Sequence, residues 1–180
     1  MWGELLTDLK DRGLKSVDIF IMDGAKGVPD VVKSHYPQSD IQICTVHALR
    51  NAMNKVRVSD KSEFIPKLKN LLLLSSNDLI DLETNKLLKE YPQYSKLINH
   101  FVNIEYLFTY LKYPQVIHKT IKSTNRIEAI NQKIKTRISH KRLFPNRESL
   151  EKILVAAILE LNNNSTRKIN GMEVYLELTK

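Results

Sequence analysis

The sequence predicts an α/β fold in which a sheet with flanking helices is interrupted by an all-helical insertion. Helix-like and strand-like segments alternate over the first 57 residues, which is typical of a layered sheet. Leucines at helical spacing without strand signals then fill residues 60–112, and two long helical segments follow. We therefore divide the chain into a partial core, an insertion, returning core helices and a tail, at residues 1–56, 57–115, 116–165 and 166–180.

The partial core begins with an amphipathic helix over residues 4–12, which ends at a glycine. Residues 17–22 are apolar on both faces and predict a strand in the middle of a sheet. A helix starts near Val28, since a proline follows in its first turn. A second strand is predicted over 41–44 and a helix over 47–56. Two strands alone do not make a stable open sheet, so the sequence suggests that the fold is incomplete.

The insertion predicts roughly three helices, because polar turn residues divide its leucine pattern twice. Residues 117–121 are expected to be a short connection back to the core. Helices are then predicted over 124–139 and 147–161. The last fifteen residues carry no pattern and are expected to form a tail.

Composition limits the class of protein. No apolar run approaches the ~18 residues of a membrane span, so no membrane contact is expected. The single cysteine excludes an internal disulfide and fits a reducing, cytoplasmic location. The sequence also lacks a P-loop, a dinucleotide-binding glycine fingerprint and a Gly-x-Ser-x-Gly element.

The positive charge of the chain is concentrated in one segment. Between Lys119 and Arg147 there are nine lysines and arginines and one acid, Glu128. The other 19 basic and 19 acidic residues cancel. A local excess of this kind predicts binding to a polyanion such as DNA, although a solvated basic helix face would look the same.

Asp23 is the first candidate for chemistry. It follows a predicted buried strand and precedes Gly24. In open α/β sheets, sites form beyond the carboxyl ends of strands, where a rigidly held carboxylate can reach a divalent cation. An Asp-Gly turn without function is the alternative.

Glu128 is the second candidate. Its predicted helix has an apolar stripe formed by Ile127, Ile130, Ile134 and Ile138. Glu128 lies at the shoulder of that stripe, near the core but open to a cleft. A surface glutamate on an amphipathic helix is the alternative.

Cys44 and His47 have a Cys-x-x-His spacing. A structural zinc needs four ligands and usually two such pairs, and the other histidines are scattered. We therefore expect a buried cysteine and a hydrogen-bonded histidine at a strand–helix junction.

Four motifs in order resemble one family, the Mutator-type transposases of bacterial insertion sequences. The strand-Asp-Gly-x-Lys-Gly element corresponds to residues 21–27, and the Cys-x-x-His-x-x-Arg-Asn signature to 43–51. A Thr-Asn-x-Ile-Glu-x-x-Asn block resembles 123–131, and a Phe-Pro-Asn loop resembles 144–146.

The resemblance implies a partial RNase H-like core with an Asp-Asp-Glu triad that binds Mg²⁺ or Mn²⁺. Asp23 matches the second aspartate and Glu128 the glutamate, as catalytic residues and metal ligands. The first aspartate would lie on an earlier strand, which makes the chain resemble a C-terminal piece of the enzyme. Cys44 and His47 match a signature to which we assign a structural role.

The resemblance also implies DNA as partner, both the ends of the insertion sequence and the target, and a homo-oligomeric full-length enzyme. The expected reaction is DNA cleavage and strand transfer. An inactive DNA-binding remnant, an RNase H-like nuclease and a structural helical protein stay open as alternatives. The residues expected to contact DNA are basic and lie near the two carboxylates or in the basic segment: Lys26, Arg126, Lys133, Lys135, Arg137, Lys141 and Arg142.

Overall fold

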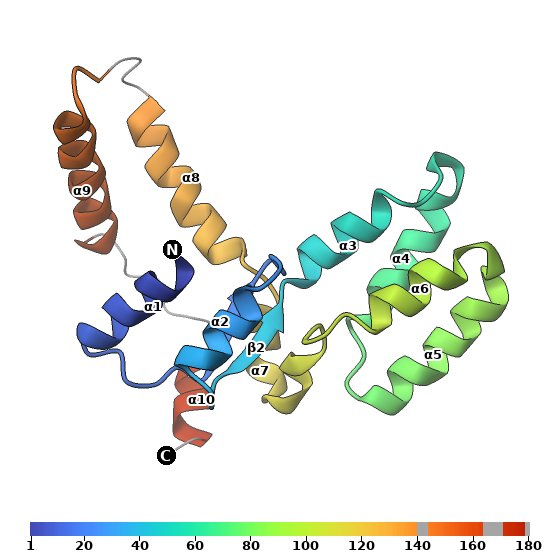
Figure 1. Ribbon diagram of the computed structural model, residues 1–180. Coiled ribbons are helices and arrows are strands. Elements are labelled where there is room, and N and C mark those ends of the chain that lie inside the picture. The colour runs from blue at the N-terminus through green and yellow to red at the C-terminus, as the bar shows by residue number, and fades with distance from the viewer. Residues whose placement is uncertain (140–143, 164–170, 179–180) are drawn as a thin grey trace.

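The computed structural model describes residues 1–139, 144–163 and 171–178. Helices dominate this part of the chain, and they surround a small parallel sheet (Figure 1). The core elements in chain order are α1 (Trp2–Asp11), β1 (Ile19–Met22), α2 (Val28–His35), β2 (Asp40–Ile43) and α3 (Thr45–Met53). Further along are η1 (Val58–Asp60), α4 (Lys61–Leu71), α5 (Asn77–Glu90), η2 (Pro92–Tyr94), α6 (Ser95–Val102) and η3 (Thr109–Lys112). The chain continues with α7 (Gln115–Ile121), α8 (Asn125–Ser139), α9 (Arg147–Asn163) and α10 (Met172–Leu178).

The sheet consists of β1 and β2 in the described residues, paired in parallel from Ile19 opposite Asp40 to Met22 opposite Ile43. Parallel neighbours need a crossover, and α2 supplies it. Successive side chains of β1 point to opposite faces. Phe20 therefore packs with the larger core, whereas Ile21 packs with the smaller cluster around α7.

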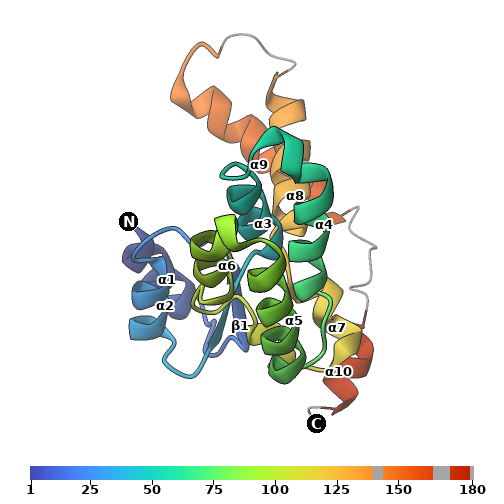
Figure 2. The same cartoon turned by 90° about the vertical axis from the view of Figure 1, so that its right-hand side faces the viewer.

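The larger core joins the sheet to α1 and α2 as well as to the helices α3 to α6. Its fully buried members include Ile41 of β2, Phe64 and Leu68 of α4, and Ile98 of α6. Figure 2 shows α4, α5 and α6 side by side, and Figure 1 shows that they lie on the other side of β2 from α1. Every element between Val58 and Lys112 is helical. The insertion stretch thus carries the helices that its leucine pattern predicts.

Two elements differ from the sequence prediction. Residues 117–121 were expected to be a connection, but they belong to the helix α7, where Ile117 and Ile121 are buried. Their spacing of four places both on one helical face, which packs on Tyr110. The expected tail contains α10, whose Tyr175 donates a hydrogen bond to Asp18 Oδ2 at 3.1 Å. These are long-range contacts that the local pattern does not encode.

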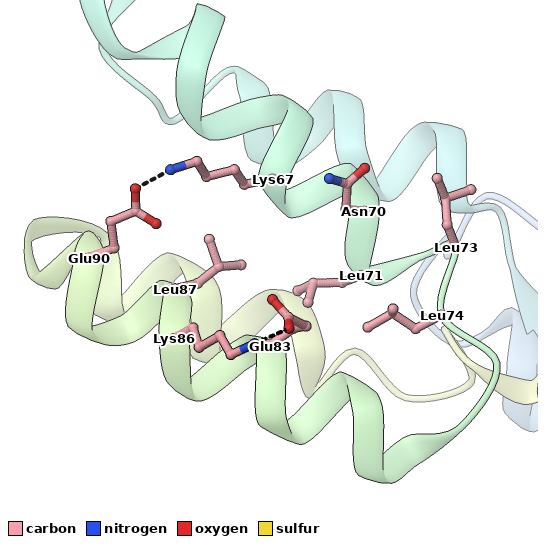
Figure 3. Close-up of a pocket in the computed structure, with 9 residues that line it drawn as sticks. All are labelled: Lys67, Asn70, Leu71, Leu73, Leu74, Glu83, Lys86, Leu87 and Glu90. Carbon is pink, nitrogen blue, oxygen red and sulfur yellow. Dashed lines mark hydrogen bonds and ion pairs between the residues drawn. The ribbon is translucent and has the colours of Figure 1, made fainter.

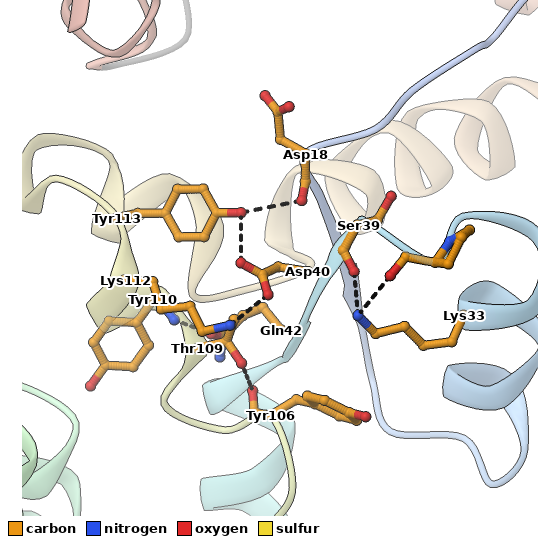
Figure 4. Close-up of polar contacts among 11 residues, drawn as sticks. Asp18, Lys33, Ser39, Asp40, Gln42, Tyr106, Thr109, Tyr110, Lys112 and Tyr113 are labelled. Carbon is orange, nitrogen blue, oxygen red and sulfur yellow. Dashed lines mark hydrogen bonds and ion pairs between the residues drawn. The ribbon is translucent and has the colours of Figure 1, made fainter. Parts of the chain in front are cut away.

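Polar side chains fix the sheet to the segment that returns from the helices (Figure 4). Lys112 forms an ion pair with Asp40 at 2.7 Å, and the hydroxyl of Tyr113 donates to Asp40 at 3.2 Å. Burial and the Asp40 carboxylate together raise the pKa of Tyr113. The start of β2 is thereby tied to the end of η3.

The helices α8 and α9 extend away from the rest of the molecule (Figure 1). α8 has no buried residue, and in α9 only Ala157 is buried. Arg137 of α8 forms an ion pair with Glu160 of α9. Within the described ranges, no helix is long and apolar enough to cross a bilayer.

Candidate functional site

A pocket of about 600 Å³ lies where β1, α3 and α8 meet. Apolar side chains of α1, α2 and β1 form most of its lining. The polar residues that line it come from the end of β1, the start of α3 and the start of α8: Asp23, His47, Thr124, Glu128 and Asn131. The structure therefore brings Asp23 and Glu128 to one pocket, although 105 positions separate them in the chain.

Asp23 follows the last residue of β1 and is exposed. Its Oδ1 accepts a hydrogen bond from the backbone N–H of Ala25 at 3.3 Å. Gly24 between them has a φ of +85°, a conformation that L side chains rarely adopt. This turn holds the carboxylate at the end of the strand.

Glu128 lies in the first turn of α8 and is held by Thr124, whose hydroxyl donates to Glu128 Oε1 at 2.6 Å. The backbone N–H of Thr124 points at the sulfur of Cys44, at 3.5 Å. Cys44 is fully buried at the end of β2, as expected. Its thiol thus fixes the residue that in turn positions Glu128.

His47 lies beside Glu128, with 3.8 Å between His47 Nδ1 and Glu128 Oε1. This separation is too long for a hydrogen bond, and Nδ1 is a buried atom without a hydrogen-bond partner in the described part of the chain. The expectation of a hydrogen-bonded histidine is wrong for this atom, because the neighbouring Glu128 carboxylate stays beyond hydrogen-bonding distance. His47 lines the pocket, a position that a Cys-x-x-His spacing alone does not reveal.

Asp23, Glu128 and Thr124 line the pocket with oxygen atoms that are possible ligands for a metal ion. Two carboxylates and a hydroxyl suit a hard cation such as Mg²⁺. However, no group of three or more His, Cys, Asp or Glu side chains among the described residues could hold a metal ion. The described residues therefore do not make up a complete two-ion centre.

The basic residues expected to contact DNA lie in different places. Lys135 follows Glu128 by seven positions and shares its helical face, and the exposed Lys133 and Arg126 project from other sides of α8. Arg137 is engaged by Glu160. Lys26 lines a separate hollow of about 260 Å³ beside Tyr106. Two further expected contacts lie outside the described residues: Lys141 and Arg142.

A second hollow of about 510 Å³ lies between α4 and α5 (Figure 3). Its rim carries the ion pairs of Lys67 with Glu90 and of Lys86 with Glu83. These side chains neutralise one another, and the described residues that line the hollow include no metal-ligand cluster. The pocket between β1 and α8 is therefore the better candidate for chemistry.

Comparison with known proteins identifies similar sequences. A model of the protein family described as "Transposase, Mutator family" matches residues 1–167. The transposase for insertion sequence element IS905 of Lactococcus lactis is 30% identical over 94% of this chain and 44% of its own length. The transposase for IS1201 of Lactobacillus helveticus is 34% identical over 84% of this chain and 42% of its own.

A third relative is the transposase for IS256 in transposon Tn4001 of Staphylococcus aureus, which is 29% identical over 93% of this chain. The match covers 44% of that transposase. The chain thus spans less than half the length of each of these relatives.

Proposed function

Because the chain belongs to the Mutator family of transposases, we propose that it binds DNA and carries two of the three acidic residues for DNA cleavage and strand transfer. Asp23 and Glu128 are the proposed pair. The observation that carries this proposal is their meeting in one pocket at the foot of the basic helix α8. The names of the relatives, all transposases for insertion sequences, support it.

We propose further that β1 and β2 belong to an RNase H-like core, with residues 1–56 and 116–165 as its parts and 57–115 as an insertion. The pocket supports this proposal because it is lined by every residue from Phe20 to Asp23 and so runs along β1. Within the described residues, β1 pairs with β2 alone, which leaves its other edge free for a strand. A strand added there would end beside Asp23 and could bring a third carboxylate.

The proposed metal ion is Mg²⁺ or Mn²⁺, held by the carboxylates of Asp23 and Glu128. When bound in pairs, such ions activate the attacking oxygen and stabilise the leaving oxygen of a phosphodiester. The described residues lack a third acidic or imidazole ligand for them. Thr124 and Cys44 would act on this site indirectly, since they fix the side chain of Glu128.

The proposed partner is DNA, held through backbone phosphates by the basic residues of α8 and of the stretch after it. Phosphate contacts of this kind give affinity without sequence preference. A DNA substrate also favours the cytoplasmic location that the single cysteine predicts. Because the described residues supply two ligands, binding without cleavage is the expected behaviour of this chain.

The test uses the purified chain with a fluorescent DNA duplex and with supercoiled plasmid. We expect weak binding whose log K falls with log salt at a slope near −4 to −5, for about five phosphate contacts. The double variant Lys133→Glu/Lys135→Glu should lose most of the affinity. The matched control is Lys69→Glu/Lys89→Glu, which makes the same charge change on exposed residues of α4 and α5.

Nicking of the supercoiled plasmid tests whether the chain holds a complete catalytic site. With Mg²⁺ or Mn²⁺ we expect no nicking above that of the Glu128→Gln variant. Nicking that disappears in Glu128→Gln would mean that the chain holds a complete catalytic site. Absence of DNA binding, or equal losses in both charge-reversed doubles, would overturn the proposed DNA-binding role of α8.

A further inference from the structure

A second stretch of the chain is basic and free of acids. Between Asp40 and Asp60 there are three basic residues and no acidic one, although most of the chain outside the main basic segment is balanced. The basic residues are Arg50, Lys55 and Arg57. This stretch contains α3, which begins at the pocket.

The starts of α3 and α8 are joined to each other. The backbone N–H of Thr45 donates to the carbonyl of Lys122 at 2.9 Å, and Thr124 contacts Cys44. His47 and Glu128 then stand 3.8 Å apart. From this common origin the two helices diverge, and both run away from the sheet (Figure 1).

The two helices carry similar side chains on the faces that continue from the pocket. On α8, Asn131 and Lys135 follow Glu128 by three and seven positions. Arg50 of α3 and Asn54, the C-cap of α3, follow His47 by the same intervals. Residues at these intervals share one helical face. Each face thus presents one amide and one cation. The two faces begin at His47 and Glu128, which lie next to each other.

Arg50 and Asn54 are exposed. Neither side chain has an ion pair or a hydrogen bond in the described part of the chain, whereas Arg137 of α8 is engaged by Glu160. Arginine and asparagine side chains are common donors to phosphate and sugar oxygens. The contacts of the described residues therefore give Arg50 no role in stabilising the fold.

We propose that α3 forms a second DNA-contacting surface, with Arg50 on a backbone phosphate and Asn54 beside it, so that the DNA lies between α3 and α8 with the carboxylate pair at their junction. This inference rests on the proposed function, since DNA is the ligand in both. It adds a contact on α3, which lies outside the main basic segment and contributes little to the net charge of the chain. Charge complementarity and continuity with the pocket commit the surface to a nucleic acid backbone.

The experiment compares three single variants of the purified chain, Arg50→Ala, Lys135→Ala and Lys89→Ala, by fluorescence anisotropy with a duplex at several salt concentrations. Each removes one exposed cation, and Lys89 lies at the end of α5 as the matched control. Arg50→Ala should raise Kd about five- to tenfold at 0.1 M salt and make the slope shallower by about 0.9, as the loss of one phosphate contact requires. Lys135→Ala should act similarly, and Lys89→Ala should leave both quantities unchanged.

The outcomes separate the two proposals. If Lys135→Ala weakens binding and Arg50→Ala does not, the α3 surface is refuted while DNA binding by α8 stands. If all three variants lose the same affinity, binding follows net charge alone and the α3 surface is refuted as well. A wild-type chain that does not bind duplex DNA would refute both. Thermal unfolding of Arg50→Ala near the wild-type temperature excludes misfolding, because the side chain is exposed.

Discussion

Gln42 is a fully buried polar residue in the middle of β2. Its amide nitrogen donates to the carbonyls of Ile43 and Leu107, both at 2.7 Å, and its oxygen accepts from the N–H of Tyr110 at 2.7 Å. Both N–H bonds of the carboxamide are therefore used. This one side chain fastens β2 to the segment that returns from the insertion (Figure 4).

We expect the substitution Gln42→Leu to lower the free energy of unfolding by about 3 kcal/mol, because it leaves buried backbone groups without partners. Gln42→Glu should lower the free energy of unfolding further at neutral pH, since its carboxylate would face two carbonyl oxygens in a fully buried position. Urea unfolding followed by circular dichroism measures both. An unfolding free energy of Gln42→Leu within 0.5 kcal/mol of the wild type, roughly the level of a neutral surface change, would contradict this role.

At the level of single residues, the sequence identifies candidates better than it identifies their partners. Asp23 and Glu128 stand out because one follows a strand and the other is the lone acid of a basic segment. The Thr124 hydroxyl bond to Glu128 links positions four apart on one helix, an interval at which side chains meet. The contacts of Cys44 and His47 cross 80 positions or more and depend on tertiary packing.

The elements α7 and α4 are held together by a small cluster around Leu72, the residue that follows α4. The ammonium of Lys122 donates to the carbonyl of Leu72 at 2.7 Å and lies 3.9 Å from the centroid of the Tyr110 ring. The hydroxyl of Tyr110 donates to the same carbonyl at 3.2 Å. Burial lowers the pKa of Lys122 and raises the pKa of Tyr110 to about 12.

These shifts predict how stability depends on alkaline pH. The pKa of Tyr110 rises from 10.0 to about 12 on folding. Its contribution to the free energy of unfolding is therefore complete below pH 10 and is lost as pH rises toward 12. Between pH 10 and pH 12 the wild type should lose up to about 2 to 3 kcal/mol of its free energy of unfolding through Tyr110, at about 1.4 kcal/mol per pKa unit. Tyr110→Phe should not show this loss. At pH 8 the variant should lose only about 1 kcal/mol, because Lys122 still donates to Leu72.

Urea unfolding between pH 8 and pH 12 tests this, with the difference between the two proteins as the readout. The lowered pKa of Lys122 acts in the opposite direction, since its stability effect grows as pH approaches 10.5. That contribution is present in both proteins and cancels in the difference. Parallel stability curves for Tyr110→Phe and the wild type above pH 10 would contradict the assignment.

Elements with a strong local signal are predictable from the sequence, and the others are not. α8 and α9 have sustained apolar periodicity and appear where they were expected. α7 was read as a connection because its seven residues are too few for a clear period. Residues 179–180 and 164–170 flank α10 and lie outside the described part, so only Met172–Leu178 can be compared with the expected tail.

At the scale of the whole molecule, the mixed helix and sheet class is confirmed, although the described sheet has two strands. The pattern of β1, apolar on both faces, predicts a strand in the middle of a larger sheet. The pocket runs along this strand, since Phe20, Ile21 and Met22 all line it. What the sequence could not predict is the divergence of α3 and α8, because it depends on how their starts pack on the ends of the strands.

The ion pair of Arg137 with Glu160 bears on the DNA binding that we propose for the molecule. Arg137 lies on α8 among the residues expected to contact phosphates, but Glu160 of α9 occupies its guanidinium. Both side chains are about half exposed, so the pair contributes at most about 1 kcal/mol to stability. A phosphate can therefore compete for Arg137, but it must displace a carboxylate that also repels it.

We predict that Glu160→Gln strengthens DNA binding. It frees one cation and removes one repelling charge, so Kd should fall about two- to fivefold at 0.1 M salt, and the salt slope should steepen by up to about 0.9. The matched control is Glu90→Gln, which frees Lys67 at the α4–α5 groove and should leave Kd unchanged. Equal strengthening by the two variants would trace the effect to net charge, and unchanged binding by Glu160→Gln would show that the α8–α9 face does not meet the DNA. Strengthening by Glu160→Gln alone requires that DNA passes this face, since the two variants change net charge equally and differ only in where the freed cation lies.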